Sequence, residues 1–203
     1  NRDATPEEIK TSVPWIKKIL EAFNIPVLEV EGYEADDVIG TIASKAGSMG
    51  FNVYMMTPDK DFAQLVGDNV FMYKPKRSGN NAEIIGPQEV KDIFMVDDPK
   101  QVVDVLALWG DSSDNIPGAP GVGEKTSKKL IREFKSVENL FEHSRELKGK
   151  LKESIEQNQD QIRLSKDLAT IRLDVPVEFN ERDLVYGGAN KEDLMKIFQE
   201  LEF

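Results

Sequence analysis

The sequence predicts an α/β fold in its first half and a mainly helical fold in its second half. Short apolar runs alternate with helical segments up to about residue 66, which is typical of parallel strands joined by right-handed crossovers. Beyond Pro87 nearly every segment has helical periodicity instead. We place a boundary at Asp97-Asp98-Pro99, which gives an α/β region of residues 1–98 and a helical region of residues 99–203.

The α/β region is predicted to run helix, strand, helix, strand, helix and then a hairpin. Thr5-Pro6-Glu7-Glu8 has the pattern of a helix start, and Asn24-Ile25-Pro26 ends that helix. Strands are expected at 27–30 and 51–56, with helices at about 36–47 and 62–66, and the hairpin strands at 70–73 and 83–85 enclose the polar segment 78–81. Seven further helices are expected at 88–96, 100–109, 125–134, 137–141, 147–158, 161–171 and 191–201.

Composition limits the kind of site that this chain can build. Its 26 Lys and Arg residues against 37 Asp and Glu residues give a formal net charge of −11, which by itself argues against a nucleic-acid partner. Cysteine is absent and there is one histidine, so a metal ion would need oxygen ligands, as Mg²⁺ or Mn²⁺ do. No apolar run is long enough for a membrane span, so we expect a cytoplasmic protein without a membrane partner.

Three groups of carboxylates stand out by their positions. They are Glu34, Asp36 and Asp37; Asp59 and Asp61; and Asp111 and Asp114. The first two groups each follow the carboxyl end of a predicted strand, where parallel sheets place their ligand crevices. Converging carboxylates repel one another, and two divalent ions about 3.5 to 4 Å apart would relieve that repulsion and could bridge a phosphodiester. The sequence therefore predicts a two-metal site.

Each acidic group also has an ordinary structural explanation. Acidic residues are favoured in the first turn of a helix, and Asp59 is a good candidate for a helix cap. Taken singly, each group is better explained in that way. The repeated placement after strands, together with the third group after an apolar helix, favours the metal site.

A basic segment with two glycines offers a local nucleic-acid-binding surface on a chain whose net charge is negative. Gly121-Val122-Gly123 leads into a predicted helix, and residues 121–135 hold five basic and two acidic residues, a sum of +3. Backbone amides at such a helix start can bind a phosphate oxygen. Glu124 stands where the phosphate-binding loop of nucleotide hydrolases needs lysine, so that motif is excluded. The glycines could equally serve only to connect two helices.

Four motifs together resemble one family. Glu34-Ala35-Asp36-Asp37, Thr57-Pro58-Asp59-Lys60-Asp61, Gly110-Asp111-Ser112-Ser113-Asp114-Asn115-Ile116-Pro117-Gly118 and Gly121-Val122-Gly123-Glu124-Lys125-Thr126 are similar in sequence, order and spacing to the 5′-3′ exonuclease domains of bacterial DNA polymerase I, which belong with the flap endonucleases. The resemblance implies a PIN-like, Rossmann-like parallel sheet and a helix-three-turn-helix DNA-binding segment at about 105–140. It also implies that the C-terminal part packs back on the core.

The same resemblance implies roles for individual residues. A two-ion Mg²⁺ or Mn²⁺ site would be lined by Glu34, Asp36, Asp37, Asp59, Asp61, Asp111 and Asp114. Among these, Asp37, Asp59 and Asp111 are expected to be the catalytic residues. DNA contacts are expected from Arg2, Gly121, Val122, Gly123, Lys125, Thr126, Lys128 and Lys129, with K⁺ at the glycine hairpin. The expected substrates are 5′ flaps, nicked duplexes and Okazaki primers. The expected partners are polymerase and proofreading domains of one longer chain in the bacterial nucleoid.

One departure from the family pattern affects the expected activity. Family members begin with a strand that carries an aspartate ligand, followed by a second aspartate and an arch helix, and these features would lie before Asn1. We therefore expect residues 1–98 to form a nuclease core without its first strand, and the chain to cleave weakly or not at all.

Two other functions are compatible with parts of the pattern. A haloacid-dehalogenase-like phosphatase would use Asp59-Lys60-Asp61 and the Gly110 to Asp114 segment, but it expects its paired aspartates on the first strand. A DNA-binding module without catalysis would use only the glycine hairpin.

Overall fold

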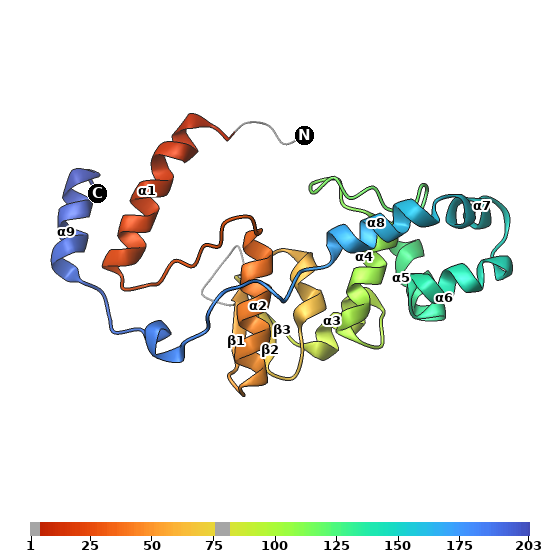
Figure 1. Ribbon diagram of the computed structural model, residues 1–203, viewed down its shortest axis with the longest axis horizontal. Coiled ribbons are helices and arrows are strands. Elements are labelled where there is room, and N and C mark those ends of the chain that lie inside the picture. The colour runs from red at the N-terminus through yellow and green to blue at the C-terminus, as the bar shows by residue number, and fades with distance from the viewer. Residues whose placement is uncertain (1–4, 76–81) are drawn as a thin grey trace. The chain divides into compact units, whose positions relative to one another are not determined.

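The computed structural model describes residues 5–75 and 82–203, and the chain forms two compact units. The larger unit, Gly32–Val177, contains the sheet and seven of the nine α-helices found in the described residues. The smaller unit joins the chain up to Glu31 with Glu178–Phe203. The fold is mixed α/β with a small sheet and a mainly helical second half, as predicted (Figure 1).

The sheet has three strands in the order β1 (Val53–Met56), β2 (Val70–Pro75) and β3 (Ala82–Ile85). Strands β1 and β2 are parallel, with Val53 opposite Val70, and are connected through the 3₁₀ helix η1 (Lys60–Leu65). Strands β2 and β3 are antiparallel, which confirms the predicted hairpin. Its polar tip, 78–81, lies outside the described residues. Strand β1 is therefore an edge strand in this part of the chain.

Two predicted elements of the α/β region are wrong. Residues 27–30 do not form a strand, and Val27 and Leu28 are exposed. A strand needs a neighbouring strand for its backbone hydrogen bonds, and residues 27–30 pair with no strand of the described chain. The helix predicted at 62–66 forms instead as the six-residue 3₁₀ helix η1, which is wound more tightly than an α-helix.

The predicted α-helices are confirmed, with ends shifted by up to three residues. They are α1 (Glu7–Ala22), α2 (Ala35–Ser48), α3 (Pro87–Phe94), α4 (Val102–Trp109), α5 (Glu124–Phe134), α6 (Val137–Glu142), α7 (Gly149–Gln157), α8 (Gln159–Ala169) and α9 (Lys191–Glu200). Short 3₁₀ turns add η2 (Pro99–Gln101), η3 (Ser144–Glu146) and η4 (Glu181–Leu184). Pro6, not Thr5, takes the N-cap position of α1.

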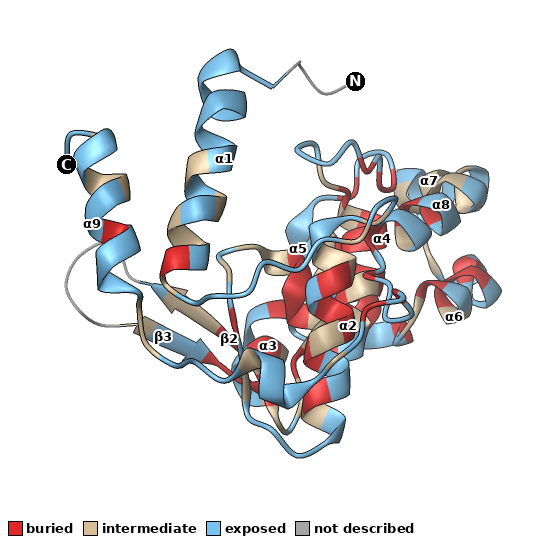
Figure 2. Ribbon diagram, turned by 60° about the vertical axis from the view of Figure 1, so that its left-hand side comes forward, coloured by how far each residue is buried: buried red, intermediate tan, exposed pale blue. Residues whose placement is uncertain are grey.

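Helix α4 is the centre of the larger unit. Its residues Val102 and Val105 to Leu108 are almost completely buried, and Figure 2 shows burial concentrated around this helix. Helices α5 and α8 pack against it, and one apolar cluster continues from Ala43 to Ile171. Because α4 is held on several sides, the loop that leaves its C-terminal end starts from a fixed point.

The division of the chain at residues 98 and 99 stays a prediction.

The smaller unit contains α1 and α9. The backbone N–H of Asn190, at the start of α9, donates to the carbonyl of Ala22 at 2.7 Å. Asn24 donates through its side chain to the carbonyl of Gly188 at 2.5 Å. These contacts join the C-terminal end of α1 to the start of α9, whereas the apolar residues Ile9 and Ile16 of α1 are exposed.

Candidate functional site

The 3₁₀ helix η1 positions the second acidic group. Asp59 caps this helix, because its Oδ1 accepts the backbone N–H of Asp61 at 3.0 Å. The N–H of Asp59 in turn donates to the hydroxyl of Thr57 at 3.1 Å. The capping role that the sequence left open for Asp59 is therefore present, and it fixes the backbone of Asp61.

A closed loop after α4 positions the third acidic group. Asp111 and Ile116 exchange two backbone hydrogen bonds of 2.9 and 2.7 Å, so residues 111–116 form a compact turn. Gly110 precedes this turn with a φ of +76°, a conformation that side chains disfavour. The Oδ1 atom of Asp111 accepts the backbone N–H of Ser113 at 2.8 Å. Its other oxygen faces away from this turn toward Lys60.

Three carboxylates from the two segments converge. One oxygen each of Asp61, Asp111 and Asp114 lies within 4.8 Å of the others. Asp61 is only 8% exposed, and its Oδ1 is the single buried side-chain oxygen or nitrogen without a hydrogen-bond partner among the described residues. A buried polar atom without a partner is costly. Its position among further carboxylates therefore fits a cation ligand, and oxygen donors suit Mg²⁺ or Mn²⁺.

The pKa values of two neighbouring carboxyls move in opposite directions. Burial and then the charge of Asp59 raise the pKa of Asp61 to about 6. Burial also acts to raise the pKa of Asp111, but hydrogen bonds from Lys60 and Ser113 outweigh it and lower that pKa to about 2. Lys60 acts to lower the pKa of both carboxyls, but it donates a hydrogen bond only to Asp111, and burial outweighs its effect at Asp61.

Lys60 also belongs to this group, a contact that was not predicted from the sequence. Its ammonium forms an ion pair with Oδ2 of Asp111 and lies 3.8 Å from Oδ1 of Asp61. It also lies 5.4 Å from the ring centre of Trp109. Burial acts to lower the pKa of Lys60, but its hydrogen bond to Asp111 raises it. The sequence signal was the position of this lysine between two aspartates.

The first acidic group lies at the start of α2, and its three residues have different surroundings. Burial, followed by the charges of Asp59 and Glu34, raises the pKa of Asp36, and Asp114 adds to this effect. Asp36 is therefore electrostatically coupled to the other two groups. Asp37 instead accepts the backbone N–H of Arg172 at 2.8 Å, and Glu34 is exposed at the N-cap position. The roles assigned to Asp36, Asp37 and Glu34 stay predictions.

Replacing Asp61 with asparagine is expected to stabilise the metal-free chain at pH 7.5, by on the order of 2 kcal/mol. The folded-state pKa of about 6 exceeds the ordinary 3.8, so ionised Asp61 destabilises the fold above pH 6. This penalty shrinks as the pH falls from 6 toward 4. Urea unfolding in EDTA at pH 7.5 and 4.5 measures the difference in the free energy of unfolding between Asp61→Asn and the parent chain. A gain for Asp61→Asn that is equal at both pH values would contradict the assignment.

The glycine hairpin forms a tight turn before α5. Gly121 has a φ of +75°, and the N–H of Val122 donates to the carbonyl of Ala119 at 3.0 Å. Gly123 caps α5, since its carbonyl accepts the N–H groups of Thr126 and Ser127 at 3.0 Å. Gly121 and Gly123 are exposed but Val122 is buried, and the DNA contacts assigned to this turn stay predictions.

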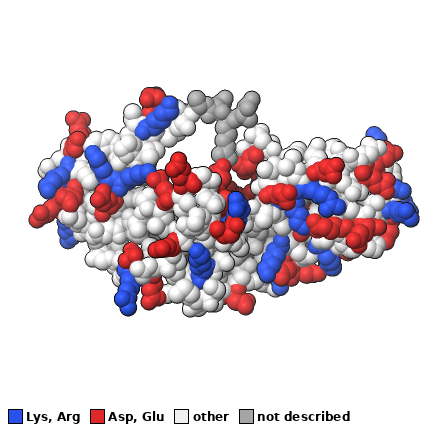
Figure 3. Space-filling view, viewed as in Figure 1, with Lys and Arg blue, Asp and Glu red and all other residues white. Residues whose placement is uncertain are grey.

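The basic residues of this region differ in availability. Lys125 and Lys129 are exposed, but the Lys128 side chain is only 12% exposed. Its ammonium lies 2.5 Å from the Glu124 carboxylate and 5.4 Å from the ring centre of Phe94. Arg2 lies outside the described residues. On the face drawn in Figure 3, acidic and basic side chains are interspersed.

Comparison with protein families decides the relationship. A family model described as the 5′-3′ exonuclease N-terminal resolvase-like domain matches residues 1–95, and the 5′-3′ exonuclease C-terminal SAM-fold domain matches residues 97–192. The chain belongs to the 5′-3′ exonuclease family. Among curated members, DNA polymerase I of Bacillus subtilis is 44% identical and that of Thermus filiformis 38% identical, and both matches include the whole chain. The chain spans only 23% and 24% of those two proteins.

Solved structures of nucleases share the fold of this 5′-3′ exonuclease family member. Bacteriophage T5 5′-exonuclease with bound divalent zinc superposes with a TM-score of 0.66 at 23% identity, covering 98% of this chain and 72% of that one. The catalytic core of Rad2 in complex with DNA substrate gives 0.61 at 17% identity, covering 98% and 64%. The PIN-like α/β prediction is confirmed by these neighbours. Within the described residues, no helix has the length and apolar character of a membrane span.

Proposed function

We propose that the chain hydrolyses DNA phosphodiesters at 5′ ends and 5′ flaps, using two divalent ions, Mg²⁺ or Mn²⁺. The observation that carries this proposal is the convergence of Asp61, Asp111 and Asp114 around a buried oxygen without a hydrogen-bond partner, in a member of the 5′-3′ exonuclease family. Two fold neighbours support it by their descriptions, a bacteriophage T5 flap endonuclease with DNA and metal ions and the Rad2 core with DNA substrate.

Different acidic residues are assigned to each of the two ions. Asp61, Asp111 and Asp114 would hold one ion. Asp36 and Asp59, which interact electrostatically, are assigned to a second ion together with Glu34 and Asp37. When bound, divalent ions neutralise the phosphate charge and supply activated water. Asp37, Asp59 and Asp111 are the carboxylates assigned to the reacting phosphate. Burial of Asp61 and Asp111 keeps bulk water from screening this charge.

A DNA duplex would contact the start of α5. Gly121, Val122, Gly123 and Thr126 supply the turn, with K⁺ as a candidate ion there, and Lys125, Lys128 and Lys129 supply charge. Arg2 is assigned to the same substrate. Nicked duplexes and Okazaki primers are the natural forms of this substrate, and polymerase and proofreading domains are the proposed partners, given the length of the DNA polymerase I relatives.

Lys129→Ala is expected to weaken duplex binding more than Lys128→Ala does. Exposed Lys129 can release a counterion on meeting a phosphate, so its loss should reduce the slope of log affinity against log salt by about 0.9. Lys128 is already paired with Glu124 and should change the slope less. Fluorescence anisotropy with a labelled duplex at several salt concentrations measures both. Equal slopes for Lys129→Ala and the unchanged chain would remove α5 from the interface.

A cleavage assay tests the proposed activity. A 5′-flapped duplex is incubated with excess chain in Mg²⁺, Mn²⁺ or EDTA, because weak cleavage is expected and single-turnover conditions reveal slow rates. Cation-dependent cleavage near the flap junction supports the proposal. Hydrolysis of a small phosphomonoester without DNA cleavage would favour the phosphatase instead. Duplex binding without any cleavage in either cation would leave only a DNA-binding module.

A further inference from the structure

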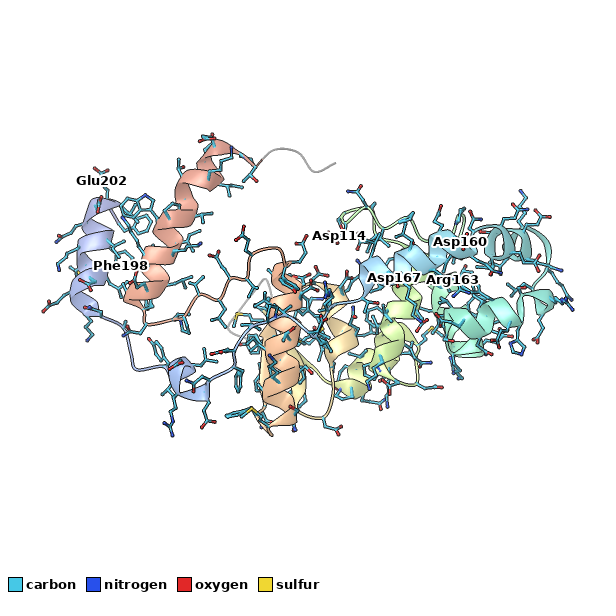
Figure 4. The ribbon with its side chains drawn as sticks, in the orientation of Figure 1. Asp114, Asp160, Arg163, Asp167, Phe198 and Glu202 are labelled. Carbon is cyan, nitrogen blue, oxygen red and sulfur yellow. The ribbon has the colours of Figure 1, made fainter. Side chains whose placement is uncertain are left out.

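Helix α8 binds both backbone polar groups of Gly118, a residue of the loop 110–118 that carries Asp111. The N–H of Gly118 donates to the hydroxyl of Ser165 at 3.0 Å, and the carbonyl of Gly118 accepts the side-chain amide of Gln161 at 2.7 Å. Ser165 is completely buried and donates its own proton to the carbonyl of Gln161 at 2.8 Å. Figure 4 shows α8 with the outward-facing Asp160, Arg163 and Asp167 labelled. Gln161 and Ser165 therefore face the loop and fix it.

Fixing Gly118 also fixes the backbone position of Asp111. A Cβ atom on Gly118 would lie 2.6 Å from the backbone nitrogen of Gly110, so the two glycine backbones touch. Both have positive φ, +76° at Gly110 and +63° at Gly118. Asp111 follows Gly110 directly and is bridged to Ile116. The loop is thus closed at its base, and a displacement of Gly118 must displace Asp111.

The end of the same helix also holds the Asp61 segment. The side-chain amide of Gln64 donates to the carbonyls of Asp61 at 3.0 Å and Ala169 at 2.8 Å. Its Oε1 accepts the N–H of Ile171 at 3.1 Å. Helix α8 and the residues just after it therefore hold both segments that carry the converging carboxylates, without contributing a carboxylate to the group.

We propose that Gln161 and Ser165 are positioning residues for the metal ligands, and that α8 sets the separation between Asp61 and Asp111. This inference rests on the proposed function. Ligand groups bind a metal ion well only where their supporting hydrogen bonds hold them in place, and losing such support typically costs 10- to 100-fold in metal affinity. The support here comes from residues 43 and 47 positions from Gly118 in sequence.

Two substitutions and one matched control test this role. Ser165→Ala removes the acceptor for Gly118, and Gln161→Met removes the donor while keeping the length of the half-buried side chain. Ser127→Ala is the control, because Ser127 is equally buried and donates to its own helix, at the carbonyl of Glu124, but contacts neither acidic segment. Calorimetry gives the Mn²⁺ affinity of each folded variant, and amide hydrogen exchange reports residues 110–118 without metal.

Ser165→Ala and Gln161→Met are each expected to lower Mn²⁺ affinity by about 10-fold and to speed exchange within 110–118. Ser127→Ala should do neither, even if it lowers the melting temperature. Unchanged affinity in both folded variants would overturn the positioning role. If Ser165→Ala fails to fold, Gln161→Met decides. If the unmodified chain binds no Mn²⁺, the proposed function fails, and unchanged exchange in Gln161→Met would then overturn the inference separately.

Discussion

Asp111→Asn is expected to weaken Mn²⁺ binding by more than about 100-fold, since it removes a proposed ligand and not merely the support of one. Single-turnover flap cleavage should fall by about 1000-fold or more, equivalent to about 4 kcal/mol of transition-state stabilisation. Asp111 carries the lowered pKa of the group and so is ionised throughout the neutral range. Calorimetry with Mn²⁺ and quenched-flow cleavage measure the two losses.

The control for this substitution is Asp160→Asn, which makes the same chemical change at an exposed position on α8 (Figure 4). It should leave both affinity and cleavage within about twofold of the parent chain, because exposed charges away from the site are screened. If Asp111→Asn retained Mn²⁺ affinity equal to that of Asp160→Asn, Asp111 would not be a ligand. Asp111→Asn should also slightly destabilise the metal-free chain, because Lys60 loses its partner, whereas Asp61→Asn stabilises it.

Lys166→Met is expected to destabilise the fold by about 3 kcal/mol, since removing one partner of a buried ion pair leaves the other charge uncompensated. Asp104 is buried in α4, and its Oδ1 accepts the Lys166 ammonium at 2.6 Å and the N–H of Val137 at 3.0 Å. Lys166 also contacts Glu138 at 2.9 Å. This network joins α4, α6 and α8. Burial raises the pKa of Asp104 even while Lys166 opposes it.

Urea unfolding followed by circular dichroism measures the loss. Adding Asp104→Asn to Lys166→Met should restore most of the stability, because a neutral amide oxygen can still accept the N–H of Val137. Lys152→Met is the control, since its partner Glu156 is 3.8 Å away at the surface, and it should cost under about 0.5 kcal/mol. A loss no larger for Lys166→Met than for Lys152→Met would show that the buried pair contributes little.

The helices could be predicted because their signals are local. The apolar spacing of α4 and α8 is visible within each segment, and the structure shifts their ends by a few residues only. Residues 27–30 carry the same kind of local strand signal, but a strand forms only with a partner, and pairing is not a local property. The sequence therefore indicates which segments favour an extended conformation, but not which of them pair into the sheet.

The site was predictable in its residue types and only partly in its contacts. Asp59, Asp61, Asp111 and Asp114 drew attention by position, and three of these converge. The contact of Asp37 with Arg172 joins residues 135 positions apart, and no local pattern encodes it. The hydrogen bonds of Ser165 and Gln161 to Gly118 are similarly distant. A buried serine in a helix resembles any small core residue until its partner is known.

Strand β1 pairs with β2 along one side only in the described part of the chain. An unpaired strand edge can recruit strands from other molecules, and Met56 on β1 is 72% exposed. Concentrated solutions of this chain should therefore self-associate through edge-to-edge pairing, which would compete with crystal growth. Natural edge strands resist this with a charged residue, so Met56→Lys is the change to make before crystallisation.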